Sequence, residues 1–424
     1  MSFVRTRTLL YAALAAAFCG SAAAQTSDPA QHQHMQMPMP DASAWMLMQD
    51  GVIFGIFNHQ GGPRGGDEFK VPNWWMGMAT RKTGRSQLTF TGMLSLDPLT
   101  VGKRGYGEIF QVGEVVDGRP LVDRQHPHDL FMQLAAVWRL ELSEATGLTL
   151  AGGPVGEPAL GPVAFMHRAS AAENPFAPLS HHTFDSTHIA FGVITAAVDH
   201  GPFVLEGSVF NGREPDENRW DFDFGRLDSV SARLWYKPAP GWELQVSTGH
   251  LRDPEQLEPG NVQRTTASAA WVKQYDTSMM AVTAGYGVND SDHGTRHAFF
   301  AEATARRGAT APYGRFELAQ VETGALLGAS TSGHGFVIDQ KDLVGAFTAG
   351  AARDLATWRG FEGALGAAAT FYAVPEALKH SHGSHPVSFQ IWFRLRPPAP
   401  MGRMWNMRMS QPMSGHPMSH QMKP

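Results

Sequence analysis

The sequence predicts an all-β fold, a transmembrane antiparallel β-barrel of about 16 strands with long external loops. Short segments along the chain alternate apolar and polar residues with a period of two, as strands with one apolar face do. The connections between these segments alternate between short and long, which is typical of barrels that cross an outer membrane. After the first 25 residues no run of 18 apolar residues occurs, so no transmembrane helix is expected.

The composition excludes several classes of protein. Charged residues make up 17% of the chain, and Gly supplies 45 positions. The net charge of -5 comes without a cluster of Lys and Arg that could neutralise phosphates, so no nucleic-acid partner is expected. The single cysteine, Cys19, rules out disulfide frameworks and metal sites built on several cysteines.

The first 24 residues have the pattern of a secretory signal peptide. Arg5 and Arg7 precede an apolar run over residues 9–18, and small residues follow up to Ala24. The mature chain is therefore expected to begin near Gln25 and to lie outside the cytoplasm, with outer-membrane lipid as its surroundings.

Sixteen segments fit a period of two. Residues 87–96 show the pattern clearly, because Leu88, Phe90 and Leu94 alternate with polar neighbours. The predicted strands cover residues 46–57, 73–82, 87–96, 130–142, 148–153, 188–198, 203–210, 227–236, 242–250, 264–274, 279–288, 298–306, 315–323, 341–351, 358–373 and 387–396. The barrel domain is thus predicted over residues 45–396.

The lengths of the connections between strands predict how the barrel is oriented in the membrane. Seven short turns are expected, near residues 82–86, 143–147, 199–202, 236–241, 275–278, 307–314 and 353–357. Eight long loops are expected, near residues 58–72, 97–129, 154–187, 211–226, 251–263, 289–297, 324–340 and 374–386. Outer-membrane barrels have short periplasmic turns and longer external loops, so both termini are expected on the periplasmic side.

Residues 130–142 fit two patterns. Asp129 could cap a helix with Leu130, Leu134 and Trp138 on its apolar face. A strand fits better, because every second residue from Leu130 to Leu142 is apolar.

Most of the 19 histidines fall in the long loops or at strand ends beside them. Two segments are the most concentrated, Gln-His-Pro-His-Asp over residues 125–129 and His-His-Thr-Phe-Asp-Ser-Thr-His over residues 181–188. Imidazoles with carboxylates nearby can ligate zinc or copper, or form an oriented polar network. The alternative is that external loops hold most polar residues, histidine included. The expected loop or lumen cluster is His126, His128, Asp129, His167, His181, His182, Asp185 and His188, and the loop over residues 154–187 is expected to enter the lumen as a constriction or plug.

Methionines gather at the two ends of the predicted barrel, with histidines between them. Thioethers are soft ligands that suit Cu(I) or Ag(I). The segments, residues 25–44 and 397–424, are Pro-rich and polar and are expected to stay outside any core, although drift in composition would produce the same pattern. The candidate metal ligands are His32, His34, Met35, Met37, Met39, Met404, Met407, Met409, Met413, His416, Met418 and His420.

Four longer motifs carry a resemblance. GYGEIFQ at residues 105–111, DRQHPHDLFM at 123–132, GEPALGPVAF at 156–165 and NGREPDENRW at 211–220 resemble an uncharacterised family of bacterial outer-membrane β-barrel proteins. The resemblance covers most of the mature chain up to Arg396 and implies the fold and location, but no activity.

A looser resemblance is to copper-resistance B-type outer-membrane barrels, which also join a Met/His-rich segment to a barrel. It implies copper binding, with periplasmic copper-handling proteins as partners. The chain departs from that family, because its N-terminal segment is short and because it continues beyond Phe393 to Pro424.

Three functions follow as hypotheses. The first is a barrel linked to binding, efflux or homeostasis of copper or silver, with Cu(I) or Ag(I) as the candidate ion. The second is a general porin or small-solute channel. The third is an outer-membrane enzyme based on His and Asp, which the absence of HExxH, GxxxxGK and GxSxG motifs disfavours.

Overall fold

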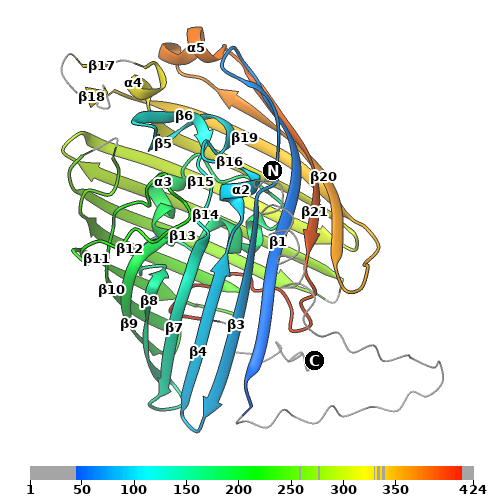
Figure 1. Cartoon of the computed structure of the whole chain (residues 1–424). Helices are drawn as coiled ribbons and strands as arrows, with labels where there is room; N and C mark the ends of the chain where they lie inside the picture. Colours follow the sequence, from blue (N-terminus) through cyan, green and yellow to red (C-terminus); the bar gives the residue numbers. More distant parts are fainter. Residues whose placement is uncertain are drawn as a thin grey trace, which may run out of the picture. The chain divides into compact units, whose positions relative to one another are not determined.

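The computed structural model describes residues 44–256, 259–275, 277–328, 330–331, 335–336 and 340–412. Sixteen antiparallel strands form a closed barrel in chain order (Figure 1). They are β1 (Met46–Gln60), β3 (Asn73–Thr83), β4 (Ser86–Leu94), β7 (Phe131–Glu141), β8 (Thr146–Gly156), β9 (Ala190–His200), β10 (Phe203–Phe210), β11 (Ser229–Tyr236), β12 (Trp242–Leu251), β13 (Val262–Gln274), β14 (Ser278–Ser291), β15 (Gly294–Arg307), β16 (Thr310–Glu322), β19 (Lys341–Asp354), β20 (Glu362–Ala373) and β21 (Val387–Arg396).

The barrel closes between its first and last strands. Strand β1 pairs with β3 on one side, and it pairs with β21 from Ile53 opposite Leu395 to His59 opposite Phe389 on the other. The predicted fold class is confirmed, and each of the sixteen predicted segments coincides with a barrel strand. Residues 130–142 contain strand β7, so the helix alternative is wrong.

The strands present opposite chemistries on their two faces. In β10, Leu205 and Val209 point outward and are exposed, whereas Glu206 and Ser208 are buried inside the barrel. The next strand repeats this, with Arg233 buried between exposed neighbours. An apolar outer band with a polar interior is the pattern of barrels surrounded by lipid.

Two predicted loops differ from the structure. Residues 289–297, expected as a long loop, contain only a tight turn at residues 292–293, because β14 and β15 extend toward it and Gly294 adopts the positive φ of 95° that the turn needs. After β1, the short strand β2 (Gly66–Lys70) pairs back onto β1 before Pro72, which lacks a backbone N–H, interrupts the strand.

The remaining elements belong to the long connections. Strands β5 (Tyr106–Val116) and β6 (Arg119–Gln125) form a hairpin, and β17 (Ser330–Thr331) pairs with β18 (Gly335–Phe336). The helices are α2 (Asp97–Thr100), α3 (His181–Phe184), α4 (Thr323–Leu326), α5 (Glu376–His382) and the 3-10 turns η1 (Phe165–His167), η2 (Ala169–Ala171) and η3 (Ser186–His188). Among the described residues no helix is long and apolar enough to cross a bilayer.

Candidate functional site

The interior of the barrel is occupied by the connection between β8 and β9, residues 157–189, here called the inserted loop. From residue 158 to residue 189 every side chain is buried except Met166 and His188, which are half-buried. Its 3-10 turn η2 contacts the barrel strands β14 and β15. The loop therefore lies against the inner wall.

Ion pairs and hydrogen bonds attach the inserted loop to that wall. Arg168 donates to Glu302 of β15 at 2.7 Å and to Asp185 of the loop itself at 3.1 Å. The Ser180 hydroxyl donates to Glu317 of β16 at 3.1 Å. Because these charges are buried and paired, the loop is held in one position.

A second attachment lies nearer the chain's last strand. Glu173 of the loop is fully buried and forms ion pairs with Arg306 of β15 and Arg394 of β21. Both arginines also pair with Asp354 of β19. One carboxylate of the loop thus pairs with two barrel strands, and the two arginines link it to Asp354 of a third.

Five histidines, three of them from the inserted loop, meet and form the histidine cluster, His126, His128, His181, His182 and His188. The ring of His181 lies at the centre, with its centroid 5.4 Å from His182, 5.4 Å from His188 and 5.8 Å from His126. The rings of His128 and His188 are 5.8 Å apart. The structure thus brings together side chains from two segments about fifty residues apart in the chain.

In every ring of the histidine cluster the Nδ1 atom has a partner. His128 contacts Asp97 at 2.9 Å, His181 contacts Asp185 at 2.8 Å and His182 contacts Glu214 at 3.1 Å. In the other two rings Nδ1 contacts a backbone carbonyl oxygen. His188 contacts the carbonyl of Asp185 at 2.7 Å, and His126 contacts the carbonyl of Pro127 at 3.2 Å.

Such contacts orient imidazole rings and fix their tautomers, as they do around metal ions. The Nε2 atom of His188 is buried without a hydrogen-bond partner among the described residues.

Burial keeps most of these rings neutral. It lowers the pKa of His188 to about 3, and it lowers the pKa of His126 well below the ordinary value of 6.5. The pKa of His181 is also lowered by burial, although Asp185 partly offsets this.

His182 is the exception. Burial opposes its charge, but Glu214 and then Glu255 outweigh that effect and raise its pKa to about 10. One ligand atom from each of these three residues lies within 4.8 Å of the others, so the group could hold a metal ion. Arg296 lies 3.3 Å from Glu255 and neutralises the charge of that carboxylate. The three residues are therefore equally well paired as an ion-pair network without a metal ion. A side chain at Gly113 would collide with the His182 ring.

The other predicted members have different partners. Asp129 is buried and pairs with Arg219 at 3.1 Å, and burial raises the pKa of Asp129 to about 6. His167 packs edge-on against Trp74 with ring centroids 5.3 Å apart, and burial lowers its pKa to about 4. Asp185 joins Arg168 to His181 and so links the histidine cluster to the loop attachments.

The chain beyond β21, residues 397–412, is here called the C-terminal segment, and it corrects one expectation. These residues were expected to stay outside any core, yet Met404, Met407 and Met409 are buried. The backbone N–H of Met404 donates to Asp50 of β1 at 2.9 Å, and that of Asn406 donates to the His167 carbonyl at 2.7 Å. The expectation failed because the segment finds apolar partners inside the barrel.

Further along, the C-terminal segment reaches the wall formed by β10 and β11. The guanidinium of Arg408 lies 4.0 Å from the centroid of the Trp235 ring, and Ser410 donates to Glu206. The segment therefore crosses the interior from β1 to β10. The remaining predicted tail ligands, His32, His34, Met35, Met37, Met39, Met413, His416, Met418 and His420, lie outside the described residues.

Sequence reasoning missed the methionines of the barrel wall. Seven of the ten buried residues in one apolar cluster are methionines, here called the methionine cluster, Met48, Met76, Met78, Met93, Met132, Met404 and Met407. The available signal was that Met76 and Met78 lie two apart in a strand and so share its inner face.

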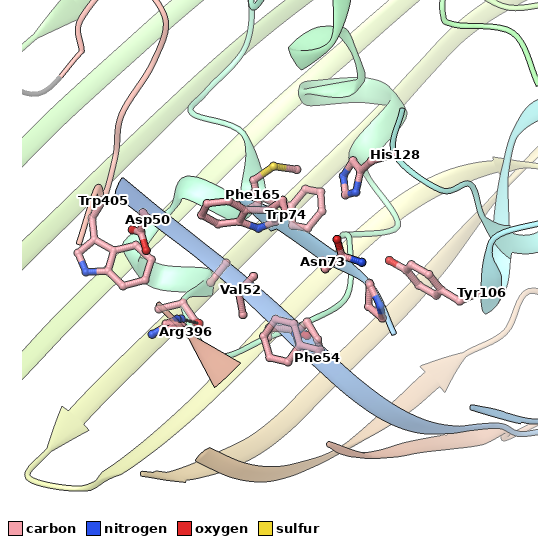
Figure 2. A pocket seen from close by; sticks show the side chains of 16 residues that line it. Asp50, Val52, Phe54, Asn73, Trp74, Tyr106, His128, Phe165, Arg396 and Trp405 are labelled. Carbon is pink, nitrogen blue, oxygen red and sulfur yellow. Dashed lines mark hydrogen bonds between the residues drawn. The ribbon is translucent and has the colours of Figure 1, made fainter. Parts of the chain in front are cut away.

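A small cavity of about 50 Å³ adjoins the histidine cluster and residues that pack against the methionine cluster. His128 of the histidine cluster lines one part of it, and Trp74 and Met166, which pack against the methionine cluster, line another. Figure 2 shows His128, Phe165, Trp74 and Asp50 grouped around this space.

Comparisons with known proteins agree with the fold. No protein-family model matches the chain. No curated protein matches it either. Among solved structures, the high-pH structure of Pseudomonas putida OprB has a TM-score of 0.51 at 10% identity, covering 84% of this chain and 94% of that one.

Two further solved structures have lower scores. An anion-selective porin from Comamonas acidovorans has a TM-score of 0.49 at 11% identity, covering 83% of this chain and 100% of that chain. A loop-deletion mutant of the Vibrio cholerae outer membrane protein OmpT has 0.49 at 9% identity, covering 84% and 100%. At these identities likeness shows the fold alone, and the chain has the closed sixteen-stranded fold of outer-membrane β-barrels.

Proposed function

We propose that the protein is a channel of the bacterial outer membrane for small solutes or ions, closed in the described conformation. The observation that carries the proposal is that two segments of the same chain, the inserted loop and the C-terminal segment, fill a barrel whose inner wall is polar. A barrel of this size leaves an aqueous channel when nothing fills it.

The two segments differ in how they can leave the interior. The inserted loop is anchored at both ends by barrel strands β8 and β9. In the described part of the chain the C-terminal segment is connected to one barrel strand, β21, which favours it as the part that withdraws. With the short turns on the periplasmic side, the C-terminal segment would close the channel from the periplasm.

Single-channel conductance in planar bilayers tests this function. The full chain is expected to stay mostly closed. A variant lacking residues 401–424 is expected to open more often or with larger conductance steps, because one of the two segments that fill the interior is removed. A deletion variant that is folded but never conducts would contradict the channel function.

The second candidate function is the handling of soft metal ions, with copper or silver as the cargo and periplasmic copper-handling proteins as partners. The methionine cluster favours it, since thioethers prefer Cu(I) and Ag(I). The Met/His-rich stretches at both ends of the chain and the resemblance to copper-resistance barrels support the same candidate. Binding of Ag(I) by the whole chain is its test.

A further inference from the structure

We propose that the methionine cluster is a binding site inside the barrel for a soft monovalent cation, Cu(I) or Ag(I). The proposal deepens the soft-metal candidate function, on which it rests, and it assigns the ion to wall residues of the barrel. It does not depend on whether the channel conducts.

The pairing of the barrel strands brings four methionines together. Met48 of β1 lies directly opposite Met78 of β3, and Met76 of β3 lies directly opposite Met93 of β4. Directly paired side chains on one face have Cβ atoms about 4.5–5.5 Å apart. Four thioethers thus stand side by side on the inner face of three neighbouring strands.

The methionine cluster is enclosed. Met404 and Met407 of the C-terminal segment pack against the wall methionines, and each of the seven members is at most 6% exposed. Asp50 holds this cover in place, because it accepts the N–H of Met404 at 2.9 Å and pairs with Arg403 at 2.9 Å. The site therefore has ligands from the wall and from a cover that can withdraw.

The composition of the methionine cluster differs from that of the larger apolar clusters. The two largest other apolar clusters of the described residues, with sixteen and twelve buried members, contain no methionine. Packing alone does not require such segregation, because Leu fills similar volume with less loss of side-chain freedom. Placing a flexible, polarizable thioether at seven of ten positions favours a role for the sulfur atoms.

The groups around the methionine cluster carry little unpaired charge. Thioethers are neutral, and the nearby Asp50 is already paired with Arg403. Hard divalent cations would lose their hydration there without gaining charged oxygen ligands. A soft monovalent cation loses less hydration energy and gains sulfur ligands.

Ag(I) binding to the purified full-length chain tests the site, because silver does not need a reducing atmosphere. The test variant carries Met76→Leu, Met78→Leu and Met93→Leu, which keep volume and remove sulfur. Its Ag(I) affinity is expected to fall at least about tenfold, since several ligands are lost together. The matched control is Met279→Leu, because Met279 is buried in β14 in a different cluster, and its affinity is expected to stay unchanged.

A second variant separates this site from the terminal methionines. In it Met35, Met37, Met39, Met413, Met418 and Met422 become Leu, and it is expected to retain the Ag(I) site. Loss of all binding in this variant would overturn the site while leaving a soft-metal function in the tails. No Ag(I) binding by the unmodified chain would overturn both.

Spectroscopy covers the case in which the triple variant does not fold. X-ray absorption of the Ag(I)-loaded tail variant is expected to show sulfur neighbours around the ion. Only nitrogen or oxygen neighbours would overturn the site.

Discussion

Replacing Glu173 with Gln is expected to release the inserted loop from the barrel wall. The substitution keeps the shape of the side chain but removes the charge that pairs with Arg394 and Arg306 in the interior. Breaking a buried ion pair costs about 3–5 kcal/mol, and Asp354, which still pairs with both arginines, places the expected loss at the lower end.

Trypsin sensitivity measures the release. Arg168 lies in the inserted loop and is buried, so trypsin should not cut after it in the unmodified folded protein. The Glu173→Gln variant is expected to be cut there. The control is Glu376→Gln, because Glu376 is 87% exposed and its pair with Lys379 contributes little. Equal protection of both variants would show that Glu173 does not hold the loop.

Acid is expected to destabilise the packed interior through His167 and His188. Burial lowers their pKa values to about 4 and about 3, against 6.5 for an exposed ring. Since the unfolded state takes up protons at a higher pH than the folded state, this stability is complete above pH 6.5 and is lost as the pH falls toward 4 and 3. At pH 4.5 the loss amounts to about 2–3 kcal/mol for each ring.

The free energy of unfolding, measured in urea at pH 7.5 and pH 4.5, tests this expectation. A variant with His167→Asn and His188→Asn should lose less stability between the two pH values than the unmodified chain. His380→Asn is the control, because His380 is exposed on α5. An identical pH dependence in all three proteins would contradict the assignment to the buried rings.

The barrel could be predicted from the sequence because its strands each carry their own signal. A strand between lipid and a polar interior must alternate every second residue, so the pattern is local and visible in segments such as β10. Strand ends were less predictable, as at β14 and β15, because those strands continue beyond the turn signal read at residues 289–297.

The interior could be predicted only in part. The two histidine segments were recognisable by composition, and the structure places five of their rings in contact. Their carboxylate partners Glu214 and Glu255 come from two other long loops. Glu214 lies in one of the four motifs, but nothing in the sequence marks either carboxylate as a partner of the histidines. Of the methionine cluster, Met404 and Met407 were predicted as soft-metal ligands. Their meeting with methionines of four strands was missed, because such contacts depend on closure of the barrel.

Cysteine labelling tests most directly whether the C-terminal segment lies inside the barrel. Cys19 lies in the expected signal peptide, so a single engineered cysteine would be the only thiol of the mature chain. Met407 is 2% exposed and Met401 is 38% exposed. In folded protein a maleimide reagent is predicted to label the Met401→Cys variant and to leave Met407→Cys unlabelled until the barrel is denatured. Equal labelling of both positions in the folded barrel would contradict the account.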